Sequence, residues 1–168
     1  MVFCADRDLL VPKTFGAVLG SCEPMDPRVF TIEEVNALIP RLNQLVAQQL
    51  AQQSDIERRL AELSRLTGSV PRSLEPDAED ASETTRIKDE LRDRIARYQE
   101  GWQHVQELGA VVKDPQIGLL DFYGRIEGRL VWLCWRYGED ALGYYHELEA
   151  GYSGRRPLGP ETRDRLLN

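Results

Sequence analysis

Apolar residues in the first two thirds of the chain recur every three or four positions, in two separate runs. Thr31 and Glu34 precede the first run with the spacing of a capping box, in which each side chain bonds the backbone amide of the other residue. We therefore predict a helix over 31–66. Pro40 lies inside the apolar stripe and lacks the backbone N–H that a helix needs, which predicts a kink or a break over 36–39.

The second run forms one continuous stripe and predicts a helix over 82–108. Gly109 suits the end of this helix, because glycine readily adopts the left-handed conformation that often terminates helices. A polar, acidic, proline-containing linker over 68–82 separates the two runs. Since each predicted helix has a single apolar face, an antiparallel helical hairpin is the economical arrangement.

After residue 109 the helical period ends, and β-branched and aromatic residues become frequent. Glu127-Gly128 lies between two such runs and is typical of a β-hairpin turn. The run LVWLCW is nearly continuously apolar, which favours a strand covered on both faces. Strand segments are predicted at 110–112, 119–126, 129–137 and 144–148, which together give a sheet over 110–148. The predicted fold class is α+β, a long antiparallel helical hairpin followed by a small antiparallel β-sheet with an Arg-containing loop.

This reading divides the chain into three parts. Residues 1–27 lack a sustained period and are expected to be a poorly ordered N-terminal extension. Met25 lies just before the first structural signal, so we hypothesise that it is the natural start. Residues 28–159 form a single domain that ends in a loop over 149–159, and residues 160–168 form a short C-terminal helix or tail.

Composition narrows the class of protein. The net charge of −7 argues against general nucleic-acid binding, which draws most of its affinity from basic side chains. The chain has three cysteines, Cys4, Cys22 and Cys134, and no CxxC pair, which favours a reduced cytoplasmic protein over a disulfide framework. Cys134 is expected in the core. No apolar run approaches the length of a membrane span, and no signal peptide is evident.

Residues 118–158 contain two of the three tryptophans, five of the six tyrosines and one of the two histidines. Three segments, FTIEEVNALIP, LGAVVKDPQIGLLDF and LCWRYGEDALGYYHELEAGYSGRRPL, resemble a bacterial family known as domain of unknown function 2203, over about residues 29–158. Where that family usually has tryptophan before its histidine, this chain has Tyr145, which retains an aromatic with a polar edge. The resemblance implies the domain limits and a hallmark carboxy-terminal motif, and it implies no activity.

One candidate site within that motif is a metal centre built from Glu139, His146 and Glu147, with Asp121 as a further ligand. Imidazole and carboxylates are ligands for zinc, iron or manganese. However, His146 and Glu147 are adjacent, so in a strand they point to opposite faces. The alternative is that His146 is structural and hydrogen-bonded to an acid or a backbone group.

A second candidate is an anion pocket of basic residues, since arginine forks suit carboxylate and phosphate. It would draw on Lys113, Arg125, Arg136, Arg155 and Arg156. The alternative is that nearby acids pair with these arginines in a structural network. Hydrolysis by Glu139 and Glu147, or a nucleophilic pair of Cys134 and His146, is less well supported by the sequence.

The interpretation that these patterns favour is a small cytoplasmic binding or adaptor protein without catalysis. It would use the Gly138–Pro157 motif for an anionic ligand or a protein partner, and its helical hairpin could mediate homodimerisation. The alternative function is a metal-dependent enzyme or metal-binding protein centred on Glu139, His146 and Glu147. The Rossmann and P-loop glycine patterns are absent, and the sequence leaves the cofactor unknown. The candidate binding residues are Asp121, Arg136, Glu139, His146, Glu147, Arg155 and Arg156.

Overall fold

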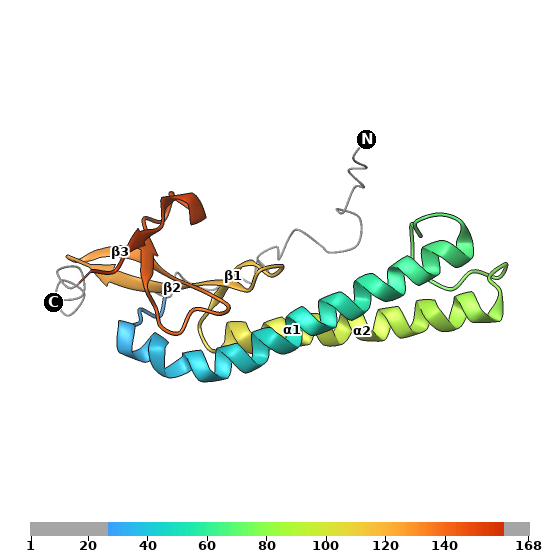
Figure 1. The fold of residues 1–168 in the computed structure, drawn as a ribbon, viewed down its shortest axis with the longest axis horizontal. Coiled ribbons are helices and arrows are strands. Elements are labelled where there is room, and N and C mark those ends of the chain that lie inside the picture. Colours follow the sequence, from blue (N-terminus) through green and yellow to red (C-terminus); the bar gives the residue numbers. More distant parts are fainter. Residues whose placement is uncertain (1–26, 160–168) are drawn as a thin grey trace.

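The computed structural model describes residues 27–159, so the expectations for the N-terminal extension, Met25 and the C-terminal helix or tail lie outside the described residues. Two helices precede a five-stranded antiparallel sheet, which confirms the predicted α+β class (Figure 1). The elements are α1 (Ile32–Thr67), α2 (Ser82–Glu107), β1 (Val111–Asp114), β2 (Leu119–Ile126), β3 (Arg129–Arg136), β4 (Tyr144–His146), the 3₁₀ helix η1 (Tyr152–Gly154) and β5 (Arg156–Pro157).

The first helix begins as the capping-box pattern predicts. The backbone N–H of Thr31 donates to Glu34 Oε2 at 2.8 Å, and the N–H of Glu34 donates to Thr31 Oγ1 at 3.2 Å. The helix continues through Pro40 without a break. Its first turns are inclined to the rest of the helix in Figure 1, as expected for a kink at a proline.

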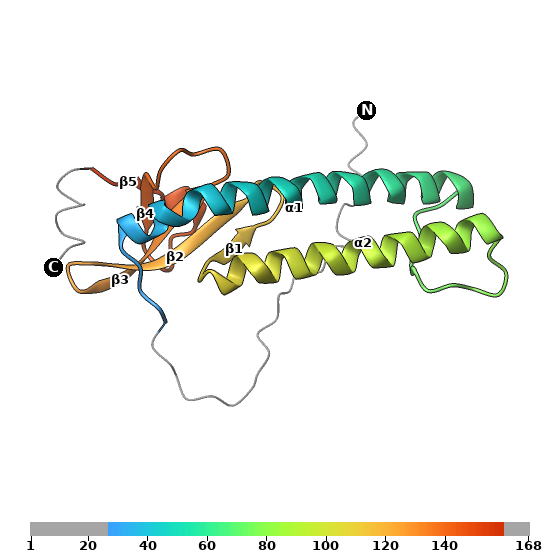
Figure 2. The same cartoon turned by 90° about the horizontal axis from the view of Figure 1, so that it is seen from below.

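The two helices form an antiparallel hairpin. The start of α1 and the end of α2 cover one face of the sheet, while the end of α1 and the start of α2 extend well beyond it (Figures 1 and 2). The core lies between this inner face and the helices. Phe122 and Trp135 from the sheet and Trp102 from α2 are fully buried there. The continuous apolar run of β3 is therefore covered on both faces, as predicted, because its alternate side chains are also buried on the outer face.

The β2–β3 hairpin has the predicted two-residue turn. Glu127 and Gly128 have φ angles of 50° and 77°, so both lie in the left-handed region that type I′ turns require. This turn pairs Ile126 with Arg129, and the register continues without a bulge along both strands. The other end of the sheet differs from the prediction. The β4 strand is only three residues long, and the short strand β5 lies in the segment that was expected to be entirely loop.

Large exposed apolar side chains are few on the helical hairpin. Within the described residues of α1, α2 and their linker, they are Leu66 and Val70, both at the far end. Over its described residues, the hairpin therefore exposes no broad apolar face to solvent. Neither helix in residues 27–159 is long and apolar enough to cross a membrane.

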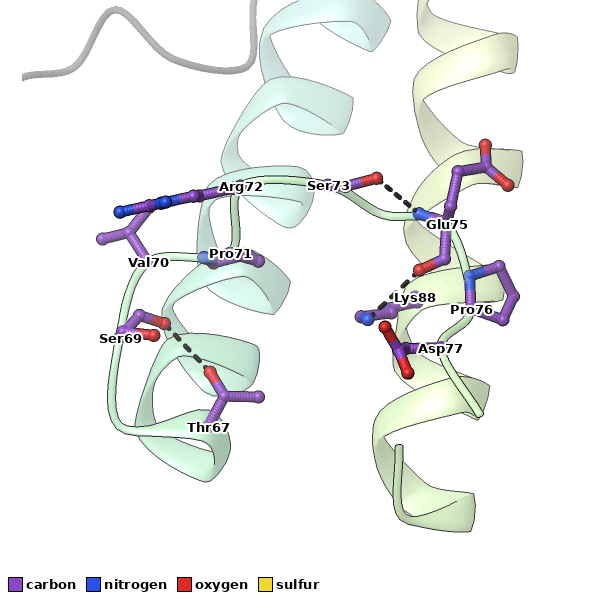
Figure 3. Close-up of a pocket in the computed structure, with 10 residues that line it drawn as sticks. All are labelled: Thr67, Ser69, Val70, Pro71, Arg72, Ser73, Glu75, Pro76, Asp77 and Lys88. Carbon is purple, nitrogen blue, oxygen red and sulfur yellow. Dashed lines mark hydrogen bonds between the residues drawn. The ribbon is translucent and has the colours of Figure 1, made fainter. Parts of the chain in front are cut away.

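The far end of the hairpin contains a hollow of about 660 Å³, which Figure 3 shows between the last turn of α1, the linker and α2. Lys88 lies at its base with only 8% of its surface exposed. The ammonium group donates to Asp80 Oδ2 at 2.6 Å and to the carbonyl oxygen of Glu75 at 3.2 Å. Lys88 therefore anchors the linker to α2. Because its ammonium group already has these partners, the hollow is not a candidate site.

Replacing Lys88 with methionine should release the linker while leaving the helices in place. We expect trypsin to cleave after the exposed Arg72 several-fold faster in Lys88→Met than in the unmodified chain, as followed by mass spectrometry. The control is Arg97→Met, which removes an exposed cation from the same helix. Equal cleavage rates in the two variants would show that Lys88 does not hold the linker.

The anchor should also depend on pH. The hydrogen bond from Lys88 lowers the pKa of Asp80 below its usual 3.8. A carboxyl group whose pKa is depressed by folding stabilises the folded state above its unfolded pKa and loses that contribution as the pH falls through the folded value. Protection of Arg72 from a protease that is active in acid should therefore persist from neutral pH to about pH 4 and fall below it.

Candidate functional site

Polar side chains from four adjacent strands gather on the outer face of the sheet, opposite the helices. These side chains are Lys113 on β1, Asp121 on β2, Cys134 on β3 and His146 on β4. Three of them are almost completely buried, because Asp121, Cys134 and His146 are 1%, 0% and 2% exposed. Buried polar groups of this kind require partners, and we name these four residues the outer-face cluster.

The imidazole of His146 has a partner at each ring nitrogen. Nδ1 lies 2.8 Å from the carbonyl oxygen of Glu147, and Nε2 lies 3.0 Å from Oδ2 of Asp121. A carbonyl oxygen only accepts, so Nδ1 carries a proton and donates it. In neutral imidazole Nε2 then has a lone pair that faces a carboxylate oxygen. A proton or another cation must therefore lie between Nε2 and Asp121.

The Asp121 carboxylate is incompletely satisfied. Its Oδ2 faces His146 and also lies 3.8 Å from the ammonium of Lys113. Its other oxygen, Oδ1, is buried without a hydrogen-bond partner within the described residues. The Lys113 ammonium is itself 3.9 Å from the centre of the Trp132 ring, which is a cation–π contact on the outer face.

Cys134 is buried, as predicted, but it belongs to the outer-face cluster and not to the core beneath the helices. Burial raises the pKa of its thiol, and the negative charge of the nearby Asp121 raises it further. The thiol therefore stays protonated at neutral pH in this environment, which disfavours a nucleophilic pair of Cys134 and His146.

A pocket of about 330 Å³ opens above Asp121 and His146. Much of its wall is apolar, and three of its side chains, Ile117, Leu148 and Tyr152, are 41–45% exposed large hydrophobic residues. Of the residues that line it, Lys113 alone has a permanent positive charge. The full lining consists of Lys113, Asp114, Ile117, Leu119, Asp121, His146, Leu148, Gly151 and Tyr152.

Glu139 and Arg155, which the sequence suggested as binding residues, form a separate cluster in which they pair with each other. The Nε of Arg155 is buried there without a hydrogen-bond partner within the described residues. One Arg155 nitrogen, Nη2, lies 2.9 Å from both carboxylate oxygens of Glu139 and 3.3 Å from the carbonyl oxygen of Cys134. The carboxylate also accepts from the backbone N–H of Arg136 at 2.8 Å. Although burial lowers the pKa of Arg155, the hydrogen bonds to Glu139 raise it overall.

Aromatic rings complete the surroundings of this pair. The Arg155 guanidinium lies 4.1 Å from the centre of the Tyr144 ring and 5.1 Å from that of Tyr152. The Glu139 backbone carbonyl accepts from the indole N–H of Trp135 at 2.9 Å. These contacts tie the turn after β3 to the segment before β5, so the pair gives this part of the fold its shape.

Of the seven predicted site residues, the structure brings Asp121 and His146 together at the base of the pocket. Glu139 and Arg155 pair with each other, and Glu147 contributes its backbone carbonyl to His146. Glu139 and Glu147 do not join His146 in the group of closely spaced ligand atoms found within residues 27–159, which consists of Asp121, Cys134 and His146. The remaining two predicted residues, Arg136 and Arg156, are exposed and do not line the pocket.

Sequence reasoning placed Cys134 in the core and so missed its position beside Asp121. The two-residue turn carried the necessary signal. Counting outward from the pair Ile126 and Arg129 along both strands gives Asp121 opposite Cys134, as the structure has it. The position of His146 carried no such signal, because the irregular segment before β4 sets the register of that strand.

Comparison with known proteins places the chain in a family. The family model described as an uncharacterized conserved protein, DUF2203, matches residues 28–158. Because this match covers well over half of the chain, the protein belongs to the DUF2203 family. Neither the curated proteins nor the solved structures that were searched include a match to it.

Proposed function

We propose that this protein is a non-catalytic binding protein that takes a small organic acid in the pocket above Asp121 and His146. The observation that carries the proposal is the composition of that pocket. Exposed apolar side chains line its wall, a buried carboxylate–imidazole pair lies at its base, and a single ammonium group stands beside them. Ligand sites are commonly concave and largely apolar, with a few convergent polar groups.

The volume favours a small molecule over a protein partner. About 330 Å³ is within the range of small-molecule sites. A protein partner would instead need several hundred Å² of complementary surface. The carboxy-terminal motif supplies much of the pocket wall, through His146, Leu148, Gly151 and Tyr152.

Lys113, the one cation among the described residues that line the pocket, would contact the acidic group of the ligand, beside the carboxylates of Asp114 and Asp121 in the same lining. Lys113 is 34% exposed at its side chain, so a ligand can reach the ammonium without unfolding β1. The pairing of Arg155 with Glu139 leaves that arginine less suited to bind an anion. An apolar portion of the ligand would cover Leu148 and Tyr152, and its acidic group would meet Lys113.

The proposal is tested by NMR titration of the ¹⁵N-labelled full chain, in the presence of EDTA, with benzoate, benzamide and acetate. Benzoate should shift the amide signals of Lys113, Leu148 and Tyr152. Benzamide lacks the charge and acetate lacks the apolar part, so both should bind more weakly. Lys113→Ala should weaken benzoate binding by about tenfold, the loss expected for a hydrogen bond to a charged group.

The matched control is Arg125→Ala, which removes an exposed cation from β2, outside the pocket. It should leave benzoate affinity unchanged. Equal binding of benzoate and benzamide, or an unchanged affinity in Lys113→Ala, would contradict the assignment of an acidic ligand to this pocket.

A further inference from the structure

We propose that Asp121, Cys134 and His146 form a zinc-binding site at the base of the pocket, with a fourth ligand supplied from solvent or by a small molecule. This inference goes beyond the binding of an organic acid and does not require it. Within residues 27–159, these three side chains are the one group of potential metal ligands whose donor atoms lie close together, all within 4.8 Å of one another.

The chemistry of the donor set suits zinc. It combines a carboxylate oxygen, a thiol sulfur and an imidazole nitrogen, all three of which bind zinc in proteins. Softer thiolate and imidazole ligands select against magnesium and calcium. Three protein ligands with one open position is the arrangement of zinc sites that bind a water or a substrate, and Asp121 and His146 both line the pocket.

The orientation of His146 supports the inference independently of the donor distances. A metal-binding histidine typically donates its second ring N–H to a carbonyl or carboxylate, which fixes the tautomer and directs the other nitrogen at the metal. The Nδ1–H of His146 makes this bond to the Glu147 carbonyl at 2.8 Å. The lone pair of Nε2 is thereby directed toward Asp121, where either a proton or a metal ion can lie between the two groups.

The charge balance also favours a divalent cation. A zinc ion bound by one carboxylate, one thiolate and one neutral imidazole gives a site with no net charge, which suits its burial. The ion would also provide a partner for the buried carboxylate, whose Oδ1 has none within the described residues. Binding would displace the thiol proton of Cys134, because a metal-bound cysteine is a thiolate.

The movement required of the imidazole and the carboxylate is small. Bonds of 2.0–2.1 Å from zinc to nitrogen and oxygen place two tetrahedral ligands about 3.3 Å apart. The Nε2 to Oδ2 distance is 3.0 Å, so these atoms need to separate by only a few tenths of an ångström. Lys113, whose side chain is 34% exposed, can turn its ammonium outward from Asp121.

The test is a cobalt titration of the metal-stripped full chain, in which Cys4 and Cys22 are replaced by serine so that Cys134 is the remaining thiol. Cobalt reports the geometry and ligands of zinc sites through its visible and near-ultraviolet absorption. We expect one Co²⁺ per chain, a thiolate-to-cobalt charge-transfer band, and loss of that band when stoichiometric Zn²⁺ is added.

Two variants and a matched control assign the ligands. Cys134→Ser should abolish the charge-transfer band, and His146→Gln should weaken cobalt binding at least tenfold. His104→Gln makes the same change at the chain's other histidine, which is exposed on α2, and should have no effect. Circular dichroism verifies that each variant is folded.

The unmodified site decides the matter even if a variant fails to fold. A folded, metal-stripped chain that binds no cobalt, or binds it without a thiolate band, overturns the zinc site. Because the benzoate titration is carried out in EDTA, that result would leave the organic-acid proposal standing, and a failure of benzoate to bind would leave the zinc site standing.

Discussion

Replacement of Arg155 by alanine is expected to lower the free energy of unfolding by about 3 kcal/mol, as measured by urea denaturation. The side chains of Arg155 and Glu139 are only 10% and 18% exposed. Removing the guanidinium leaves the Glu139 carboxylate poorly solvated, with only the backbone N–H of Arg136 as a partner among the hydrogen bonds described above. Such a broken pair costs more than the pair itself contributes to stability.

The neighbouring Arg156 provides the control, because it is an exposed arginine in the next position of the chain. Arg156→Ala should change the unfolding free energy by less than about 0.5 kcal/mol. If Arg155→Ala changed the unfolding free energy as little as Arg156→Ala, the Glu139–Arg155 pair would not stabilise the fold. The prediction that these two residues bind a ligand or partner would then be favoured.

Gly109→Ala should have a comparable effect, a loss of about 3 kcal/mol, through the junction of the helices with the sheet. Gly109 follows α2 with a φ of 93°, a conformation that costs alanine about 1–2 kcal/mol. An added Cβ would also lie 2.3 Å from the Phe30 ring, which is 2% exposed and packs edge-on against Phe122. Displacing a buried ring adds about 1–3 kcal/mol.

A second glycine separates the two causes. Gly128 in the β2–β3 turn has a φ of 77°, but a Cβ there would meet nothing within 4 Å. Gly128→Ala should therefore cost only the conformational strain, about 1 kcal/mol. Thermal denaturation measures the loss of stability in both variants. Equal losses would show that the contact with Phe30 contributes nothing.

Much of the fold follows from local sequence signals. The capping box at Thr31, the glycine after α2 and the Glu127-Gly128 turn each specify a conformation within a few residues, and the structure has all three. Of the two outcomes predicted at Pro40, a kink or a break, the break does not occur, because α1 is continuous. A proline removes a single hydrogen bond, and the packing of the long apolar face on both sides of it is sufficient to keep the helix continuous.

The candidate site was less predictable because it depends on contacts between strands. Glu139 and Arg155 are near one another in the motif and both charged, so they read as binding residues, whereas the structure pairs them with each other. Cys134 reads as a core residue because its neighbours in sequence are apolar. Its position beside Asp121 becomes apparent only when the alternation of faces along β3 separates it from Trp135.

The Glu127-Gly128 turn therefore matters to the chemistry of a site that lies roughly 20 Å away along the strand, six residues beyond Gly128. If the pairing of β2 with β3 slipped by one residue, Trp135 would stand opposite Asp121 and Cys134 would face the helices. The turn therefore determines which residue of β3 lies beside Asp121 at the pocket. We expect relatives to tolerate insertions in the β2–β3 hairpin only where the added residues loop out and the pairing of Asp121 with Cys134 is kept.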